Sequence, residues 1–148
     1  MAEDSNHPEL SAAFEAHLKE TEGQITRLEQ VADLLGTAPT GKKCKGMEGV
    51  IEEGSEALEE DGDENVLDIG IIGAGSRVEH YEIAGYTTAI SLAKQLGNDK
   101  AVSLLNQNLG EEKAADEKLR KIADRLLKIA PSSEDSTQKA KKASAGTN

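Results

Sequence analysis

Apolar residues recur at spacings of three and four along most of this chain, and its sequence has no segment that alternates like a β-strand. Such spacing places apolar side chains on one face of an α-helix. Helices are therefore predicted over residues 9–35, 42–59, 64–96 and 99–130, with glycine-containing stops after the first and third. Because the connections are short, the predicted fold class is all-α, an antiparallel bundle of three long helices and one short one.

The two ends of the chain differ from this pattern. Residues 1–8 are polar and end in Pro8, and residues 132–148 combine several lysines with small or polar side chains. Segments of that composition bury too little apolar surface to offset the entropy lost on ordering. We therefore expect a flexible N-terminus over 1–8, one helical domain over 9–131 and a disordered lysine-containing tail over 132–148.

The charge balance narrows the classes of partner. The chain has 28 Asp and Glu residues against 17 Lys and Arg, which gives a formal net charge of −11. Nucleic acids and anionic membranes attract basic surfaces, no apolar stretch approaches the roughly 20 residues of a membrane span, and the N-terminus does not resemble a signal peptide. With a single cysteine, the chain cannot form an intramolecular disulfide. We expect a cytoplasmic protein that binds neither nucleic acid nor membranes.

Two short motifs imitate ligand-binding sequences but lack essential residues. Residues 69–78 resemble a dinucleotide fingerprint, yet Val78 replaces the third glycine and no carboxylate follows about 20 residues later. Residues 61–72 begin like a calcium loop, yet Val66 and Ile72 occupy the positions of the required glycine and glutamate. We interpret the first as a glycine-rich helix face that lets a neighbour pack closely, and the second as an acidic turn.

Cys44 allows two interpretations. The adjacent Lys42, Lys43 and Lys45 could lower the pKa of its thiol and make it reactive. Its place at the start of the apolar stripe predicted for residues 42–59 favours a buried structural cysteine instead.

Carboxylates interrupt the apolar stripes of the third and fourth predicted helices. Glu79 and Glu82 lie three residues apart on one stripe, and Glu112 and Asp116 lie four apart on the other. Charged side chains are almost never fully buried without a partner. His80 is about 100° around the helix from Glu79, so we expect it at the surface or outside the cluster.

Polar residues also share one side of the first predicted helix, where His17, Glu20 and Gln24 follow at spacings of three and four. Facing acids inside a bundle repel one another and lose hydration, and metal ions would remove that conflict. Oxygen-rich ligand sets with an occasional imidazole suit iron or manganese, and di-iron bundles use inward-pointing carboxylates. The pattern therefore suggests a metal site; the alternative is that these acids lie at stripe edges and reach water.

Four runs of the sequence carry a family resemblance in a consistent order: FEAHLKETEGQITRLE at 14–29, KCKGMEG at 43–49, RVEHYEIAGY at 77–86 and EEKAADEKL at 111–119. Together they resemble the YciE/YciF-type stress-response family of the ferritin-like superfamily. The resemblance implies a ferritin-like helical bundle, usually dimeric, with a di-iron or related metal centre and a stress-related role. The biochemical activity of that family is not well established.

Carried over by position, the resemblance implies a di-iron or di-manganese site that could support redox chemistry with oxygen or peroxide. Its implied metal ligands are the residues His17, Glu20, Glu79, Glu82, Glu112 and Asp116. Gln24 and Tyr86 would be polar neighbours of that site. Whether the protein is an enzyme stays open at this point.

The resemblance also brings one departure. Members of the family normally begin with a further long helix that supplies core surface and a carboxylate, whereas this sequence starts just before the segment that resembles their second one. We therefore expect an incomplete ligand set and an open apolar face, covered by dimerisation, a swapped helix or residues 42–59. The alternative function is a non-enzymatic bundle that acts through dimerisation or partner-helix binding, with the metal site lost.

Overall fold

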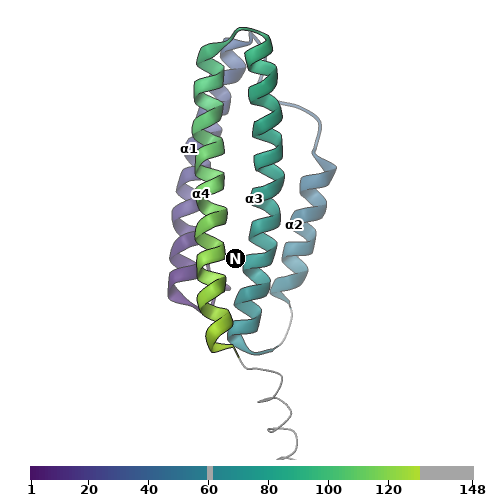
Figure 1. Ribbon diagram of the computed structural model, residues 1–148. Coiled ribbons are helices and arrows are strands. Elements are labelled where there is room, and N and C mark those ends of the chain that lie inside the picture. The colour runs from purple at the N-terminus through teal and green to yellow at the C-terminus, as the bar shows by residue number, and fades with distance from the viewer. Residues whose placement is uncertain (60–61, 131–148) are drawn as a thin grey trace, which may run out of the picture.

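The computed structural model describes residues 1–59 and 62–130. Within them the three long helices lie side by side and the short one lies against the outer side of the third helix (Figure 1). The helices are α1 (Pro8–Leu34), α2 (Lys45–Leu58), α3 (Glu64–Gln95) and α4 (Asp99–Ile129). The all-α bundle expected from the sequence is confirmed, and every helix end lies within three residues of its predicted position.

Helix α4 is the centre of the packing. It packs against both α3 and α1, while α2 packs only against α3 to a comparable extent. Each of these neighbouring pairs is antiparallel (Figure 1). Among the described residues, α1 and α3 have little direct contact. The side of the bundle between these two helices is therefore less tightly packed than the α1–α4 and α3–α4 interfaces.

Glycines end two of the long helices as the sequence predicts. Gly36 and Gly97 both have φ of +65°, a left-handed conformation that glycine adopts without a Cβ penalty. The next residues, Thr37 and Asn98, donate their backbone N–H groups to carbonyls five residues earlier, which completes the Schellman pattern. The acidic turn predicted before α3 has a capping role, since Asp63 accepts a hydrogen bond from the backbone N–H of Asn65.

The core consists of two apolar clusters at opposite ends of the bundle. One cluster includes Leu10, Ile72 and Leu126, and the other includes Val31 and Leu105. Between them lies a layer of buried polar residues, which are Gln24, Glu79, Asn108, Glu112 and Asp116. The sequence therefore places its most costly buried groups together at mid-height, where they can interact.

Helix α3 approaches its neighbours most closely at Gly75. A Cβ atom there would lie 3.1 Å from Cδ1 of Leu119 and 3.2 Å from Cε1 of Phe14, whereas a Cβ at Gly70 would meet nothing within 4 Å. At Gly75, the expected use of a glycine for close packing is confirmed. Residues 69–78 lie inside a continuous helix and not at a strand-to-helix turn.

This contrast predicts different stabilities for two similar variants. Gly75→Leu is expected to lower the free energy of unfolding by about 1–3 kcal/mol relative to Gly70→Leu, because only the first overpacks a close contact. Urea denaturation followed by circular dichroism measures the difference. Equal midpoints for the two variants would contradict the packing described for Gly75.

Residues 1–7, for which the sequence predicted no order, make specific contacts with α3. The backbone N–H groups of Asn6 and His7 donate to the carboxylate of Asp68 at 2.9 and 2.7 Å. Asp68 is buried, so these bonds compensate its charge and tie down the entry to α1. The predicted tail over 132–148 lies outside the described residues. No described helix is long and apolar enough to cross a membrane.

The prediction of a buried structural Cys44 is wrong, because its side chain is exposed. Helix α2 begins one residue later, so Cys44 occupies the N-cap and not the packed face of the helix. Its Sγ lies 3.0 Å from the hydroxyl of Tyr81, and this contact lowers the pKa of the thiol. The side of α2 that packs includes Met47, Val50 and buried Gly54.

Candidate metal centre

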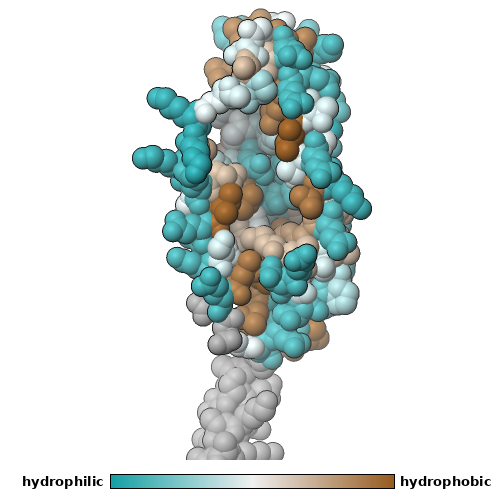
Figure 2. Space-filling model, turned by 180° about the vertical axis from the view of Figure 1, so that it is seen from behind, coloured by the Kyte–Doolittle hydropathy of each residue, from teal (hydrophilic) through white to brown (hydrophobic). Residues whose placement is uncertain are grey.

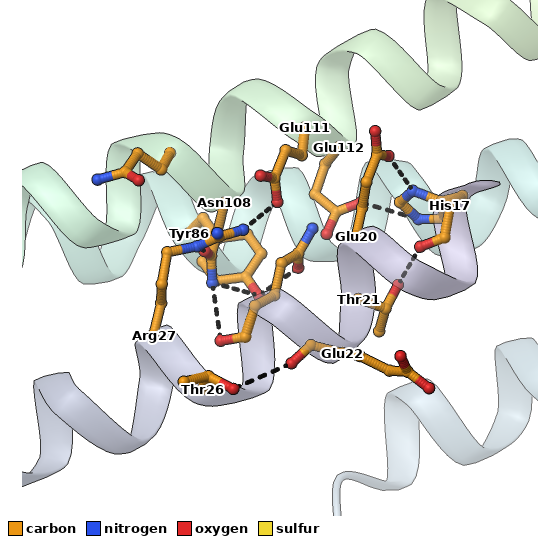
Figure 3. Close-up of polar contacts among 12 residues, drawn as sticks. His17, Glu20, Thr21, Glu22, Thr26, Arg27, Tyr86, Asn108, Glu111 and Glu112 are labelled. Atoms are coloured by element: carbon orange, nitrogen blue, oxygen red, sulfur yellow. Dashed lines mark hydrogen bonds and ion pairs between the residues drawn. The ribbon is translucent and has the colours of Figure 1, made fainter.

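Three side chains from three helices converge in the buried polar layer. Nε2 of His17 on α1 lies 3.4 Å from Oε1 of Glu79 on α3 and 3.3 Å from Oε2 of Glu112 on α4. One ligand atom from each residue lies within 4.8 Å of the other two, the arrangement of a possible metal site. Figure 3 shows His17 and Glu112 approaching each other across the α1–α4 interface.

Glu20 orients the imidazole of His17. Its Oε2 lies 3.1 Å from Nδ1 of His17, on the side of the ring away from the buried acids (Figure 3). Metal-binding histidines usually donate their second ring N–H to such a carboxylate, which fixes the tautomer and the ring orientation. The structure thus places Glu20 behind His17, half-exposed, and not among the three converging ligand atoms.

The two buried acids have oxygen atoms that lack partners. Glu112 is fully buried, and neither of its carboxylate oxygens has a hydrogen-bond partner among the described residues. Oε2 of Glu79 likewise has no hydrogen-bond partner among the described residues. Hydrogen bonds do not compensate these atoms, and the nearest cationic group in the triad is the imidazole of His17, 3.3 Å from Oε2 of Glu112; a metal ion would satisfy them. One imidazole nitrogen and several carboxylate oxygens form a donor set that fits iron or manganese better than a thiolate-binding metal.

The pKa values of the metal-free site reflect this crowding. Contacts with the carboxylates of Glu112 and Glu79 raise the pKa of His17 to about 11, so the imidazole is protonated at neutral pH. Burial raises the pKa of Glu79 to about 7. Burial would also raise the pKa of Glu112, but contacts with His17, Glu79 and Gln24 lower it overall. A proton on His17 therefore occupies the place that a metal ion would take.

Two further acids predicted as ligands lie outside this triad. Glu82, one helical turn from Glu79, is half-buried; burial, and then the charge of Glu112, raise its pKa. Asp116 accepts a hydrogen bond from Ser76 at 3.0 Å and lies 3.1 Å from Nε of Arg120.

The exposed His80 lies 3.5 Å from Asp116, outside the triad, as its helical position predicts. The charge of Asp116 therefore already has partners of its own.

A hydrogen-bond network continues from the triad toward the other end of the bundle. Tyr86 donates to Oε1 of Gln24 at 2.9 Å, and Nδ2 of Asn108 lies 3.2 Å from the hydroxyl of Tyr86. Arg27 donates to both Asn108 and Glu111 (Figure 3). Nε2 of Gln24 makes no hydrogen bond of good geometry among the described residues, but the contact of Gln24 with Glu112 helps to lower the pKa of that acid and links the network to the triad.

The sequence interpretation identified Gln24 and Tyr86 as neighbours of the site but missed Asn108, Arg27 and Glu111. The position of Asn108 contained a usable signal, because it lies four residues before Glu112 on the same face of α4. No comparable signal marked Arg27, whose contacts depend on how α1 packs on α4.

An apolar groove lies beside the triad, between α1 and α3. Leu28, Tyr86, Ala89 and Leu105 contribute to its walls, together with Glu82. Figure 2 shows this face of the molecule hollowed, with hydrophobic side chains on both sides of the hollow. Helix α2 borders the groove but packs on α3.

The chain matches the family described as "Domain of unknown function (DUF892)" over residues 1–130. It is 46% identical over 124 residues to Protein YciF of Escherichia coli K12, a match that covers 83% of this chain and 75% of that protein. Its fold is similar to the crystal structure of the E. coli stress protein YciF, with a TM-score of 0.83 and 44% identity, covering 87% of this chain and 82% of that one. A second similar structure, YcfI from Rhodopseudomonas palustris, described as a candidate structural protein, has a TM-score of 0.77 and 44% identity, covering 80% and 76% of the two chains.

Proposed function

This chain belongs to the DUF892 family of YciF-like stress proteins, and we propose that it binds a carboxylate-bridged pair of iron or manganese ions in the bundle core. The observation that carries the proposal is the convergence of His17, Glu79 and Glu112 on one buried point. Bound iron or manganese would supply a redox-active Lewis acid for chemistry with oxygen or peroxide. The single, exposed cysteine is compatible with a cytoplasmic setting.

The residues around the site would have different roles in binding the metal ions. His17, Glu79 and Glu112 each offer one ligand atom to a first ion. The unpartnered carboxylate oxygens of Glu79 and Glu112 would be available to a second ion, and Glu82 is the nearest further acid on α3. Glu20 would keep the imidazole in its ligating orientation through Nδ1.

Metal analysis of protein purified from iron- or manganese-supplied cells tests this proposal. We expect one to two ions per chain in the parent protein and a loss of about tenfold or more when Glu79 and Glu112 are both replaced by Ala, because the buried ligands are removed. Glu111→Ala is the matched control, since Glu111 contacts Arg27 and not the triad. Metal content that is unchanged by the double replacement would refute the proposal.

The number of protons released on metal binding is expected to depend on the pH. At pH 6 both His17 and Glu79 hold a proton in the metal-free protein, whereas at pH 8 Glu79 has lost its own. Because ligands must be deprotonated, loading the site should release about two protons per chain at pH 6 and about one at pH 8. A pH indicator in weakly buffered solution measures the release. The same number at both pH values would contradict the pKa assigned to Glu79.

A second candidate function is association of two copies of this chain through the open face. Leu18 and Ile25 on α1 are 62% and 55% exposed. They lie about 160–180° around the helix from Arg27, which contacts α4, so they border the face that α4 does not cover. Exposed apolar side chains beside an apolar groove are typical of an interface. The description of the R. palustris relative as a candidate structural protein is compatible with such a role.

Replacing Leu18 and Ile25 by Glu is expected to convert a dimer into a monomer, because four like charges would meet at a two-fold interface. Light scattering should give twice the 15.7 kDa chain mass for the parent protein and the single mass for the variant. Leu127→Glu with Ile129→Glu is the control, since both residues are equally exposed but lie on α4. A monomeric parent protein would rule out this association.

A further inference from the structure

The apolar groove between α1 and α3 has the size and lining of a site for a hydrocarbon chain. Its volume is about 340 Å³, and small organic ligands occupy pockets of about 300–1,000 Å³. Met47 and Gly85 also line it, and Glu82 is the one charged residue of its wall. A water-sized group takes about 30 Å³ in a liquid, so the groove has room for a chain of about ten carbons.

A nucleophile lies in the wall of this groove. Cys44 at the N-cap of α2 and Tyr81 on α3 both line it, and Sγ of Cys44 lies 3.0 Å from the hydroxyl of Tyr81. The Tyr81 hydroxyl, and then the backbone N–H groups of Met47 and Gly46, lower the pKa of the thiol and so favour its reactive thiolate form. Gly46 leaves room for this contact, since a Cβ there would lie 2.9 Å from Cζ of Tyr81.

Lysines flank this cysteine in a chain that is acidic overall. Lys42, Lys43 and Lys45 are its close sequence neighbours, and all three are exposed. Lys43 contacts Glu48, whereas Lys42 and Lys45 form no ion pair among the described residues. This local positive charge would attract an anionic group that the net charge of −11 repels elsewhere.

The groove, the thiol and the lysines together define one kind of ligand. An uncharged apolar molecule would use the groove alone, and a free fatty acid would use the groove and the lysines but not the thiol. An acyl thioester on a phosphorylated carrier uses all three. Its chain suits the groove, its carbonyl carbon is the electrophile that a thiolate attacks, and its carrier is anionic.

We propose that Cys44 is a site of S-acylation, at which an acyl thioester of a phosphorylated carrier transfers its acyl group to the thiol and the chain occupies the α1–α3 groove. Sγ of Cys44 bonds to the carbonyl carbon, and the bond between that carbon and the carrier sulfur breaks. The carrier thiolate takes up the proton that Cys44 releases. One thioester replaces another, so no oxidant or reductant is needed, and burial of the chain favours the product.

Intact-mass spectrometry of the full chain incubated with decanoyl-coenzyme A at pH 7 tests this proposal. We expect one acyl group per chain, which neutral hydroxylamine removes because it cleaves thioesters and leaves lysine amides intact. Cys44→Ser should carry no hydroxylamine-sensitive group. Acylation of lysines only, or no covalent product, would overturn the proposal. None of the substituted residues is a proposed metal ligand, so failure of metal binding would leave these results intact.

Gly85→Leu tests whether the groove receives the chain. A Cβ at Gly85 would meet nothing within 4 Å, so the leucine can extend into the groove. We expect it to slow decanoyl transfer about fivefold or more, the effect of one or two buried methylene groups. Acetyl transfer from acetyl-coenzyme A and the reaction of Cys44 with iodoacetamide should keep the parent rates. Gly70→Leu is the matched control, because Gly70 is also exposed on α3 with open space at its Cβ but does not line the groove.

Ala89→Phe fills the groove from a second position and keeps the test decisive if Gly85→Leu perturbs α3. Decanoyl transfer at the parent rate in both variants would show that the chain stays outside the groove and would overturn the proposal.

Replacing Lys42 and Lys45 by Gln tests the choice of carrier. The decanoyl thioester of N-acetylcysteamine has no phosphate, so the ratio of its rate to that of decanoyl-coenzyme A cancels changes in thiol reactivity. We expect the advantage of the coenzyme A thioester to fall about fivefold or more in the double variant. An unchanged ratio would contradict the recognition of an anionic carrier.

Discussion

Manganese(II) or iron(II), supplied at about 100 times its dissociation constant, is expected to raise the Tm of the protein by about 5–11 °C. A ligand at that ratio stabilises the folded state by about 2.7 kcal/mol, and each kcal/mol shifts the Tm of a chain of this size by about 2–4 °C. Glu112→Ala is expected to abolish the metal-dependent shift, because it removes a fully buried ligand. Differential scanning calorimetry with and without metal measures both values.

Glu111→Ala is the control for this thermal experiment. Glu111 precedes Glu112 on α4 and is ion-paired with Arg27, so its loss changes the charge equally without altering the triad. The control should keep the full metal-dependent shift, even if its metal-free Tm falls. A Glu112→Ala protein that metal stabilises as strongly as the parent would show that the ion binds elsewhere.

His17→Ala is expected to lower the stability of the metal-free protein by about 3–5 kcal/mol at pH 7. Removing one partner of a buried ion pair leaves the other charge uncompensated, and here two acids, Glu79 and Glu112, lose their only cation within the triad. Chemical denaturation compares this variant with His80→Ala. His80 is an exposed histidine beside Asp116, so its replacement should cost less than about 1 kcal/mol. Equal stability of the two variants would contradict the charge compensation assigned to His17.

The stability difference between the parent protein and His17→Ala is expected to depend on pH. The pKa of His17 is raised from 6.5 to about 11 by its contacts with Glu112 and Glu79, so its stabilising effect is complete below pH 6.5 and is lost as the pH rises toward 11. The pKa of Glu79 is raised from 4.5 to about 7 by burial, so its ionisation destabilises the folded protein as the pH rises through that range. The difference between the parent and His17→Ala should therefore shrink above neutral pH.

The helical arrangement could be predicted because periodicity and helix-ending glycines are local signals. The same periodicity identified His17, Glu79 and Glu112, since each is a polar residue on an otherwise apolar stripe. It did not separate these three from Glu20 and Asp116. That distinction depends on which side of an imidazole a carboxylate reaches and on the nearby Ser76 and Arg120 of other turns.

Features that depend on tertiary packing were less accessible. The exposure of Cys44 follows because α2 begins at Lys45, three residues later than predicted, which leaves Cys44 at the N-cap. A small cavity of about 80 Å³ between α1 and α4 arises because Ala13 and Ala16 lie across from Ala114 and Ala115 on two helices far apart in sequence. Small residues at such positions are ordinary in helices, so only their juxtaposition marks the space as unusual.

The most direct test of the metal centre is a crystal structure of the protein soaked with manganese(II), with data collected for anomalous scattering. Our account predicts an anomalous peak bounded by Nε2 of His17 and the carboxylates of Glu79 and Glu112. A second peak beside the same two carboxylates would establish the metal pair. No peak at this point under saturating manganese, or a peak only among other acidic residues, would contradict the central claim.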